Sequence, residues 1–180
     1  MKELLIRSTD FEVTGDGRNI EGIAIAYDRP SQVTDDGVKR YWEEFDPKAP
    51  AQTIRMRAMR ALFVEHEHLR GSVGETTFAD SAEGLIFRAR MSDTRYASTT
   101  LGRINDGELT DVSLGFRSLR HLTRSDPTKG AIIRRTEVAI EELSLARVGQ
   151  HDGTKILSVR SEGTPRLDAL RRRKLLLGTW

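Results

Sequence analysis

Short segments in which apolar and polar residues alternate recur along most of this chain, and they constrain its fold more than any other feature. Alternation with a period of two is typical of β-strands that pack one face against a core. Segments with the wider apolar spacing of an amphipathic helix are few. The sequence therefore predicts a β-rich α+β domain. The expected strands cover residues 20–27, 38–45, 61–65, 73–78, 85–91, 109–116, 132–145 and 154–159.

One internal helix has clear start and stop signals. Asp93 or Thr94 can cap its first turn, and Gly107 can end it. Its predicted buried face is a stripe of apolar residues at helical spacing: Ala97, Leu101 and Ile104. A shorter helix fits the segment after Pro50, where proline suits a first helical turn. Residues 28–37 and 120–130 are rich in polar and turn-forming residues and are expected to form loops.

Composition limits the protein classes that this chain can belong to. Its 180 residues are enough for one domain with a proper core. The absence of cysteine excludes disulfides, thiolate catalysis and cysteine-ligated metals. No apolar run approaches the roughly 20 residues that span a bilayer, and the apolar stretch at the N-terminus is too short for a secretory signal. We therefore expect no membrane partner.

Charge is close to balanced, at a formal +2, but the C-terminus is basic. We expect a folded domain over residues 1–160 and a basic tail over residues 161–180, with a helix from Pro165 to Leu177. This tail is either a docking segment or a solvated terminal helix. The run Arg171–Lys174 is weak support for nucleic-acid binding, because charge elsewhere does not form a basic face.

Ser113 is the most informative residue of the predicted strand 109–116. Val112, Leu114 and Phe116 fall on one face of that strand, whereas Ser113 and Gly115 fall on the other. The pattern buries the apolar face and presents a hydroxyl on the open side. Such a serine is either an ordinary surface residue or a nucleophile that needs a base.

Histidine is the usual base near neutral pH, and two of the four histidines, His66 and His68, end an apolar strand. Residues two apart on a strand share a face, so both side chains can reach one cleft. The same pair, with Glu65 or Glu67 nearby, also resembles part of a metal site, but no third ligand is clear. The other two, His121 and His151, lie in polar segments and are most simply solvated.

A carboxylate commonly orients the base of an activated serine, and Glu142 is the best candidate. In the alternating segment 138–144 it shares a face with Val138 and Ile140, which indicates burial. A buried acid needs a partner, since burial of an unpaired charge is costly. The alternative is a carboxylate at the rim of the domain, paired with one of the many arginines.

The order of several sequence blocks resembles the prohead (capsid maturation) serine proteases of HK97-type tailed bacteriophages. The block that ends in Ser113-Leu-Gly-Phe116, which follows the internal helix, is the closest match. The resemblance covers roughly residues 18–160. Its blocks are Ile20–Tyr27, Phe45–Ala49, Ala61–His66, Gly84–Ala89, Asn105–Phe116 and Glu142–Leu145.

This resemblance implies a herpesvirus-protease-like fold, a closed β-barrel-like sheet flanked by a few helices. It implies that Ser113 is the nucleophile, His66 the general base and Glu142 the third member, with no cofactor and no metal. His68 stays open as the alternative base, because Glu67-His68 stands where the family usually has aspartate after its histidine.

The family also implies partners and a location. Its members process scaffold or the scaffold-like arm of the major capsid protein, and often cleave themselves. They act inside the procapsid, in the host cytoplasm. The resemblance therefore also implies self-association as a further expectation. Two other classes stay open at this point. One is a non-catalytic assembly protein with the same fold, and the other is a small-ester hydrolase, although the Gly-x-Ser-x-Gly elbow of common esterases is absent.

Overall fold

The computed structural model of this protein describes residues 4–14, 17–34 and 38–147. Strands dominate these residues, and two α-helices and one 3₁₀ turn accompany them. The β-rich class expected from the alternating segments is therefore confirmed. The elements are β1 (Leu4–Thr14), β2 (Asn19–Ala26), β3 (Ser31–Thr34), β4 (Arg40–Phe45), α1 (Ala51–Met56), β5 (Arg60–Val64), the 3₁₀ turn η1 (His68–Arg70), β6 (Gly74–Asp80), β7 (Gly84–Met91), α2 (Arg95–Asn105), β8 (Asp111–Asp126) and β9 (Gly130–Ala146).

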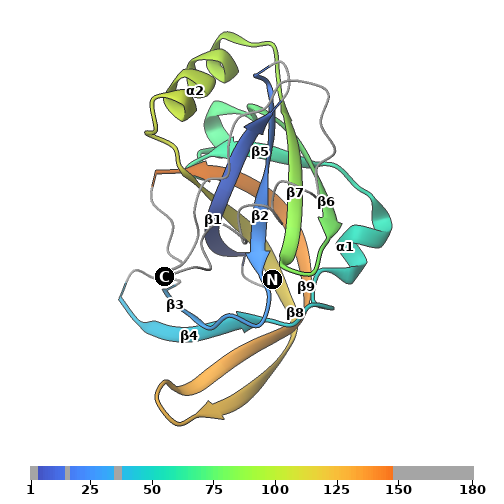
Figure 1. Cartoon of the computed structure of the whole chain (residues 1–180), viewed down its shortest axis with the longest axis vertical. Helices are drawn as coiled ribbons and strands as arrows, with labels where there is room; N and C mark the ends of the chain where they lie inside the picture. Colours follow the sequence, from blue (N-terminus) through green and yellow to red (C-terminus); the bar gives the residue numbers. More distant parts are fainter. Residues whose placement is uncertain (1–3, 15–16, 35–37, 148–180) are drawn as a thin grey trace, which may run out of the picture.

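All nine strands belong to one sheet, in the order β3-β4-β9-β5-β6-β7-β2-β1-β8. The sheet curls into a half-barrel, as the crossing ribbons of Figure 1 show. β8 also pairs with β9, so the pairing returns to a strand already inside the series. β9 is parallel to β5 and antiparallel to β8, which places these three strands side by side.

The core lies on the inner face of the curled sheet, where the apolar members of the alternating segments meet. In β8, Val112, Leu114 and Phe116 lie in this core, as the alternation predicts, whereas Ser113 and Gly115 are buried on the opposite face. Phe116 packs edge-on against Phe45 of β4, with ring centroids 5.2 Å apart. Burial of this apolar surface is the main stabilising contribution to such a fold.

The two predicted helices are confirmed, and both follow their local signals. The Thr94 side chain accepts a hydrogen bond from the Ala97 amide at 3.1 Å, so Thr94 is the N-cap of α2. Gly107 follows the helix at a φ of +72°, a conformation that glycine adopts without strain. α1 begins directly after Pro50. In Figure 1, α2 lies at the end of the sheet from which β8 starts.

The predicted loop at residues 120–130 is wrong. β8 continues to Asp126, and β9 starts at Gly130, so the segment is the tip of a long hairpin. Figure 1 shows this hairpin extending beyond the body of the domain. Both faces of its tip carry exposed polar residues, which hides the alternation. The Asp126 carboxylate accepts hydrogen bonds from the Thr128 and Lys129 amides and fixes the turn.

Two further strands were not predicted. β3 lies inside the expected loop 28–37, and it is a short edge strand that pairs with β4 alone. β1 lies in an N-terminal segment to which no strand was assigned, and it pairs with both β2 and β8. Pairing with neighbouring strands, and not the residue pattern of the segment itself, determines whether such short or terminal segments form strands.

Ion pairs to two buried glutamates of β4 hold the hairpin against this strand. Glu44 is only 1% exposed, and its carboxylate accepts two hydrogen bonds from Arg124 of β8, both 2.7 Å long, and one from Arg134 of β9. The neighbouring Glu43 accepts a hydrogen bond from Arg135 at 2.7 Å. Charge-assisted hydrogen bonds of this kind are stronger than neutral ones.

Several sequence-based expectations lie outside the described residues. They are the strand 154–159, His151, the domain boundary near residue 160 and the basic tail 161–180 with its helix. Within the described ranges, no helix combines the length and the apolar character that crossing a bilayer requires.

Candidate active site

The three residues predicted to carry the chemistry lie together in one hydrogen-bonded chain. His66 Nε2 lies 2.8 Å from Ser113 Oγ. On the other side of the ring, His66 Nδ1 lies 2.5 Å from Glu142 Oε1. These contacts join positions 47 and 76 residues apart in the sequence.

The sheet register explains why these distant positions meet. Ser113 in β8 is paired with Ser144 in β9, and Ser144 is paired with Phe63 in β5. Ser113 therefore lies on the outer face of three adjacent strands, whereas its neighbours Val112 and Leu114 face the core. The expectation of an open, exposed serine is wrong, because Ser113 is only 3% exposed.

His66 lies in a turn directly after β5. The sequence pattern had placed it at the end of the strand, so that prediction is wrong. Glu65 and His66 both adopt positive φ angles, +49° and +59°, which non-glycine residues rarely do. The Glu65 amide donates to the Leu145 carbonyl at 2.8 Å, and the His66 amide donates to Ser144 Oγ at 3.3 Å. This turn directs the imidazole back over β9 toward Ser113.

Glu142 reaches the site through a β-bulge. The register shifts so that Gly115 opposes Glu142 while the next residue, Phe116, opposes Ile140. The bulge places Glu142 on the face opposite to Ile140. The prediction that Glu142 shares a face with Val138 and Ile140 is therefore wrong, although Glu142 is buried as expected, at 4% exposure.

Gly115 makes room for this carboxylate. A β-carbon built at position 115 would lie 2.5 Å from Cγ of Glu142, closer than real β-carbon contacts occur. Glycine thus lets the Glu142 side chain cross over the neighbouring strand toward His66. The glycine that flanks the serine in the sequence has a steric function in the site.

The electrostatics favour an ionised Glu142. Burial raises the pKa of its carboxyl, but hydrogen bonds and charge from His66 and His68 outweigh burial, so the pKa lies below its ordinary value. An ionised carboxylate only accepts hydrogen bonds, so His66 donates through Nδ1–H. The Nε2 lone pair then faces Ser113 Oγ and can take its proton.

His68 contacts the same carboxylate, an arrangement that sequence reasoning did not foresee. Its Nε2 bonds to Glu142 Oε2, and its ring packs against Phe63 at a centroid distance of 4.7 Å. The His-x-His spacing is the available signal, but spacing alone predicts two side chains on one face of a strand. His68 begins the turn η1 and is half-exposed.

Comparison with known proteins identifies the family. The sequence profile of the caudovirus prohead serine proteases, peptidase family S78, matches residues 2–167. The chain belongs to this family. The resemblance found in the sequence blocks is therefore confirmed. No curated protein sequence matches the chain.

A solved structure shows the same fold. The chain is similar to the capsid assembly protease of bacteriophage T4, with a TM-score of 0.56 and 11% sequence identity. The alignment covers 81% of this chain and 98% of the T4 chain. At this identity the similarity concerns the fold.

The two glutamates beside the histidine pair bind arginines. Glu67 pairs with Arg70 at 2.8 Å, and Glu65 pairs with Arg147 at 3.1 Å. The described residues hold no group of three or more histidine, aspartate or glutamate side chains that could ligate a metal.

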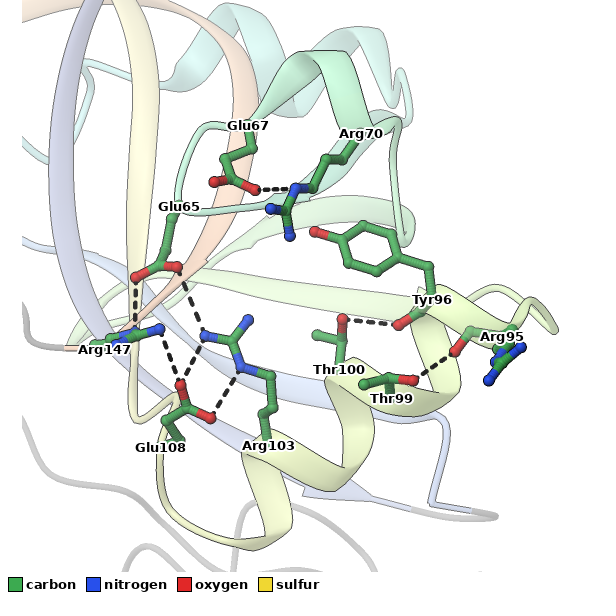
Figure 2. Close-up of a pocket in the computed structure, with 10 residues that line it drawn as sticks. All are labelled: Glu65, Glu67, Arg70, Arg95, Tyr96, Thr99, Thr100, Arg103, Glu108 and Arg147. Carbon is green, nitrogen blue, oxygen red and sulfur yellow. Dashed lines mark hydrogen bonds and ion pairs between the residues drawn. The ribbon is translucent and has the colours of Figure 1, made fainter.

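A pocket of about 600 Å³ lies beside the turn that carries His66. Figure 2 shows that charged side chains line most of it, and they come from this turn and η1, from α2, and from the residues that follow α2 and β9. Ser113, His66 and Glu142 do not line this pocket, so it neighbours the candidate active site without containing it.

Proposed function

We propose that this protein is a serine endopeptidase in which Ser113 is the nucleophile, His66 the general base and Glu142 the residue that orients and stabilises His66. One observation carries the proposal, namely the continuous chain of hydrogen bonds from Ser113 Oγ through the His66 ring to the buried Glu142 carboxylate. Nucleophile, base and orienting acid stand in the order that acyl transfer requires.

The proposed reaction follows from this order. His66 Nε2 takes the Ser113 proton while Oγ attacks the carbonyl carbon of the peptide bond. The imidazolium, stabilised by Glu142, then gives that proton to the departing amine nitrogen, and an acyl-enzyme remains. Water attacks the ester, loses a proton to His66 and releases the acid, and Ser113 regains its proton.

The proposed substrates are capsid components. Membership of the prohead serine protease family supports cleavage of scaffold, of the scaffold-like arm of the major capsid protein, or of both. The protease would act inside the procapsid in the host cytoplasm, and its own chain is a further substrate in this proposal. No membrane or nucleic-acid partner is included.

We propose a closed, herpesvirus-protease-like β-barrel, and the additional pairing of β8 with β9 supports it. Pairing that returns to its starting strand is what a closed sheet requires.

Co-expression with the neighbouring capsid and scaffold genes tests the function. We expect intact mass measurement to find shortened capsid protein or scaffold with the wild-type chain and full-length proteins with Ser113→Ala. Unchanged masses in both cases would sink the protease proposal. A non-catalytic assembly protein would give normal shells and the same masses with either chain.

A further inference from the structure

Four charged side chains next to the candidate active site form a connected set, which we name the charged cluster: Glu65, Arg103, Glu108 and Arg147. Arg103 donates two hydrogen bonds to Glu108, both 3.0 Å long, and lies 3.6 Å from Glu65. Arg147 pairs with both carboxylates at 3.1 Å. Figure 2 shows the two arginines between the two glutamates.

The charged cluster connects the three segments that carry the proposed catalytic residues. Glu65 directly precedes His66 in the turn after β5. Glu108 lies between α2 and β8, ahead of Ser113, and Arg147 directly follows β9, which carries Glu142. Arg103, in the last turn of α2, completes the set. Each of the three segments that carry a proposed catalytic residue thus contributes one charged side chain to the charged cluster.

The backbone of the His66 turn needs such external support. Two consecutive non-glycine residues with positive φ form a conformation that persists only where surrounding contacts hold it. The Glu65 and His66 amides have one partner each in β9. The Glu65 carboxylate adds ion pairs to two more segments, α2 and the residue after β9.

A second ion pair in the same turn provides a contrast. Glu67 pairs with Arg70 three residues later, so this pair connects the turn only to itself. Both glutamates are partly exposed, with side-chain exposures of 37% for Glu65 and 43% for Glu67. An exposed pair by itself contributes little to global stability. The two glutamates are therefore similar in exposure, but Glu65 connects the turn to other segments whereas Glu67 does not.

We propose that Glu65 is a positioning residue for the catalytic base, and that the charged cluster fixes the His66 turn relative to the segments carrying Ser113 and Glu142. The inference rests on the proposed function, because it assumes that His66 activates Ser113. Catalysis depends on placement within a fraction of an ångström, so a small displacement of the turn slows the reaction strongly while the fold stays intact.

The test compares Glu65→Gln with Glu67→Gln as its matched control. Procapsids carrying each full-length chain react with a fluorophosphonate probe, which acylation-competent serines attack with loss of fluoride. We expect Glu65→Gln to lower the maximal labelling rate by roughly 10- to 100-fold, with a half-saturating probe concentration within about twofold of wild type. Glu67→Gln should stay within about threefold of wild type, and the melting temperatures of both purified variants should stay close to wild type.

Arg147→Gln provides a second variant at the other end of the cluster. It should lower the same maximal rate, and combining it with Glu65→Gln should cost less than the product of the two single effects, because both remove one contact. Equal rates for Glu65→Gln and Glu67→Gln, or a loss that follows the folded fraction, overturn the inference. A wild-type chain that neither labels nor processes capsid proteins overturns the proposed function instead.

Discussion

Glu142 has two histidine partners, but only one of them reaches the serine. His66 bonds to both Glu142 and Ser113. His68, whose side chain is half-exposed, contacts only the carboxylate among these two partners. At the scale of residues this difference separates two roles that the spacing of the histidines could not separate. In the proposed reaction His66 moves the proton, and His68 holds the Glu142 carboxylate.

Replacement of each histidine by glutamine should therefore have unequal effects. We expect His66→Gln to reduce cleavage by at least about 1,000-fold, as loss of a triad base does, and His68→Gln by about tenfold or less. The measurement is the rate of capsid-protein processing in co-expression. A larger loss for His68→Gln than for His66→Gln would assign the base to His68.

Substitution of Gly115 should also slow the proposed reaction. A methyl group at this position collides with Glu142, so Gly115→Ala should displace the carboxylate and reduce cleavage by roughly 10- to 100-fold. Gly102 in α2 is the matched control, because a β-carbon there meets nothing within 4 Å. Gly102→Ala should leave cleavage unchanged and raise the free energy of unfolding by up to about 1 kcal/mol. Cleavage by Gly115→Ala at the wild-type rate would contradict the steric account.

Among the elements, the hairpin of β8 and β9 has two parts with different structural roles. Its inner part carries Ser113 and Glu142, and its outer part is held to β4 through Glu44. The hydrogen bond from Arg124, opposed by burial and supported by Arg134, holds the pKa of Glu44 below its ordinary value of 4.5. A carboxyl whose pKa is lower in the folded protein stabilises the fold when ionised.

The stability contributed by Glu44 should therefore depend on pH with a definite sign. It is fully present above pH 4.5 and is lost as the pH falls through the lowered pKa of the folded state. We expect Glu44→Gln to cost about 1.5–3 kcal/mol near neutral pH, and progressively less in acid. Thermal unfolding of both proteins across this pH range measures the difference.

The exposed pair of Arg120 and Glu137 on the same hairpin is the control for this measurement, since its side chains are 80% and 40% exposed. Glu137→Gln should cost less than about 1 kcal/mol at any pH. A cost for Glu44→Gln that grows as the pH falls would contradict the assigned direction.

For the whole molecule, local sequence patterns predicted most helices and strands. The sheet topology, which brings the residues of the candidate active site together, was not predictable from these patterns. The alternation in β8 predicted which residues face the core but not that Ser113 on the other face is buried as well, and the capping signals predicted α2. The pairing of β5, β9 and β8 depends on contacts between distant segments, which no short pattern contains. The prediction of Glu142 succeeded for burial and failed for its face, because a bulge reverses the alternation at one position.

The His66 turn was beyond sequence reasoning for a different physical reason. Two consecutive positive φ angles at Glu65 and His66 contradict the preferences of both residues, and only tertiary contacts maintain them. The pattern also fails at the hairpin tip, because pairing with β9 maintains the 120–126 part of β8 although that part is mostly polar and exposed. Local rules fail where function or distant pairing determines the backbone.

The buried Ser113 is the proposed nucleophile, and the position of a covalent adduct on the chain tests this claim. Procapsids from co-expression are treated with a fluorophosphonate probe, and peptide mass spectrometry identifies the modified residue. We predict one adduct on Ser113 of the wild-type chain and none in Ser113→Ala or His66→Gln. Processing by a wild-type chain whose adduct lies on another serine, or by the Ser113→Ala chain, would contradict the claim.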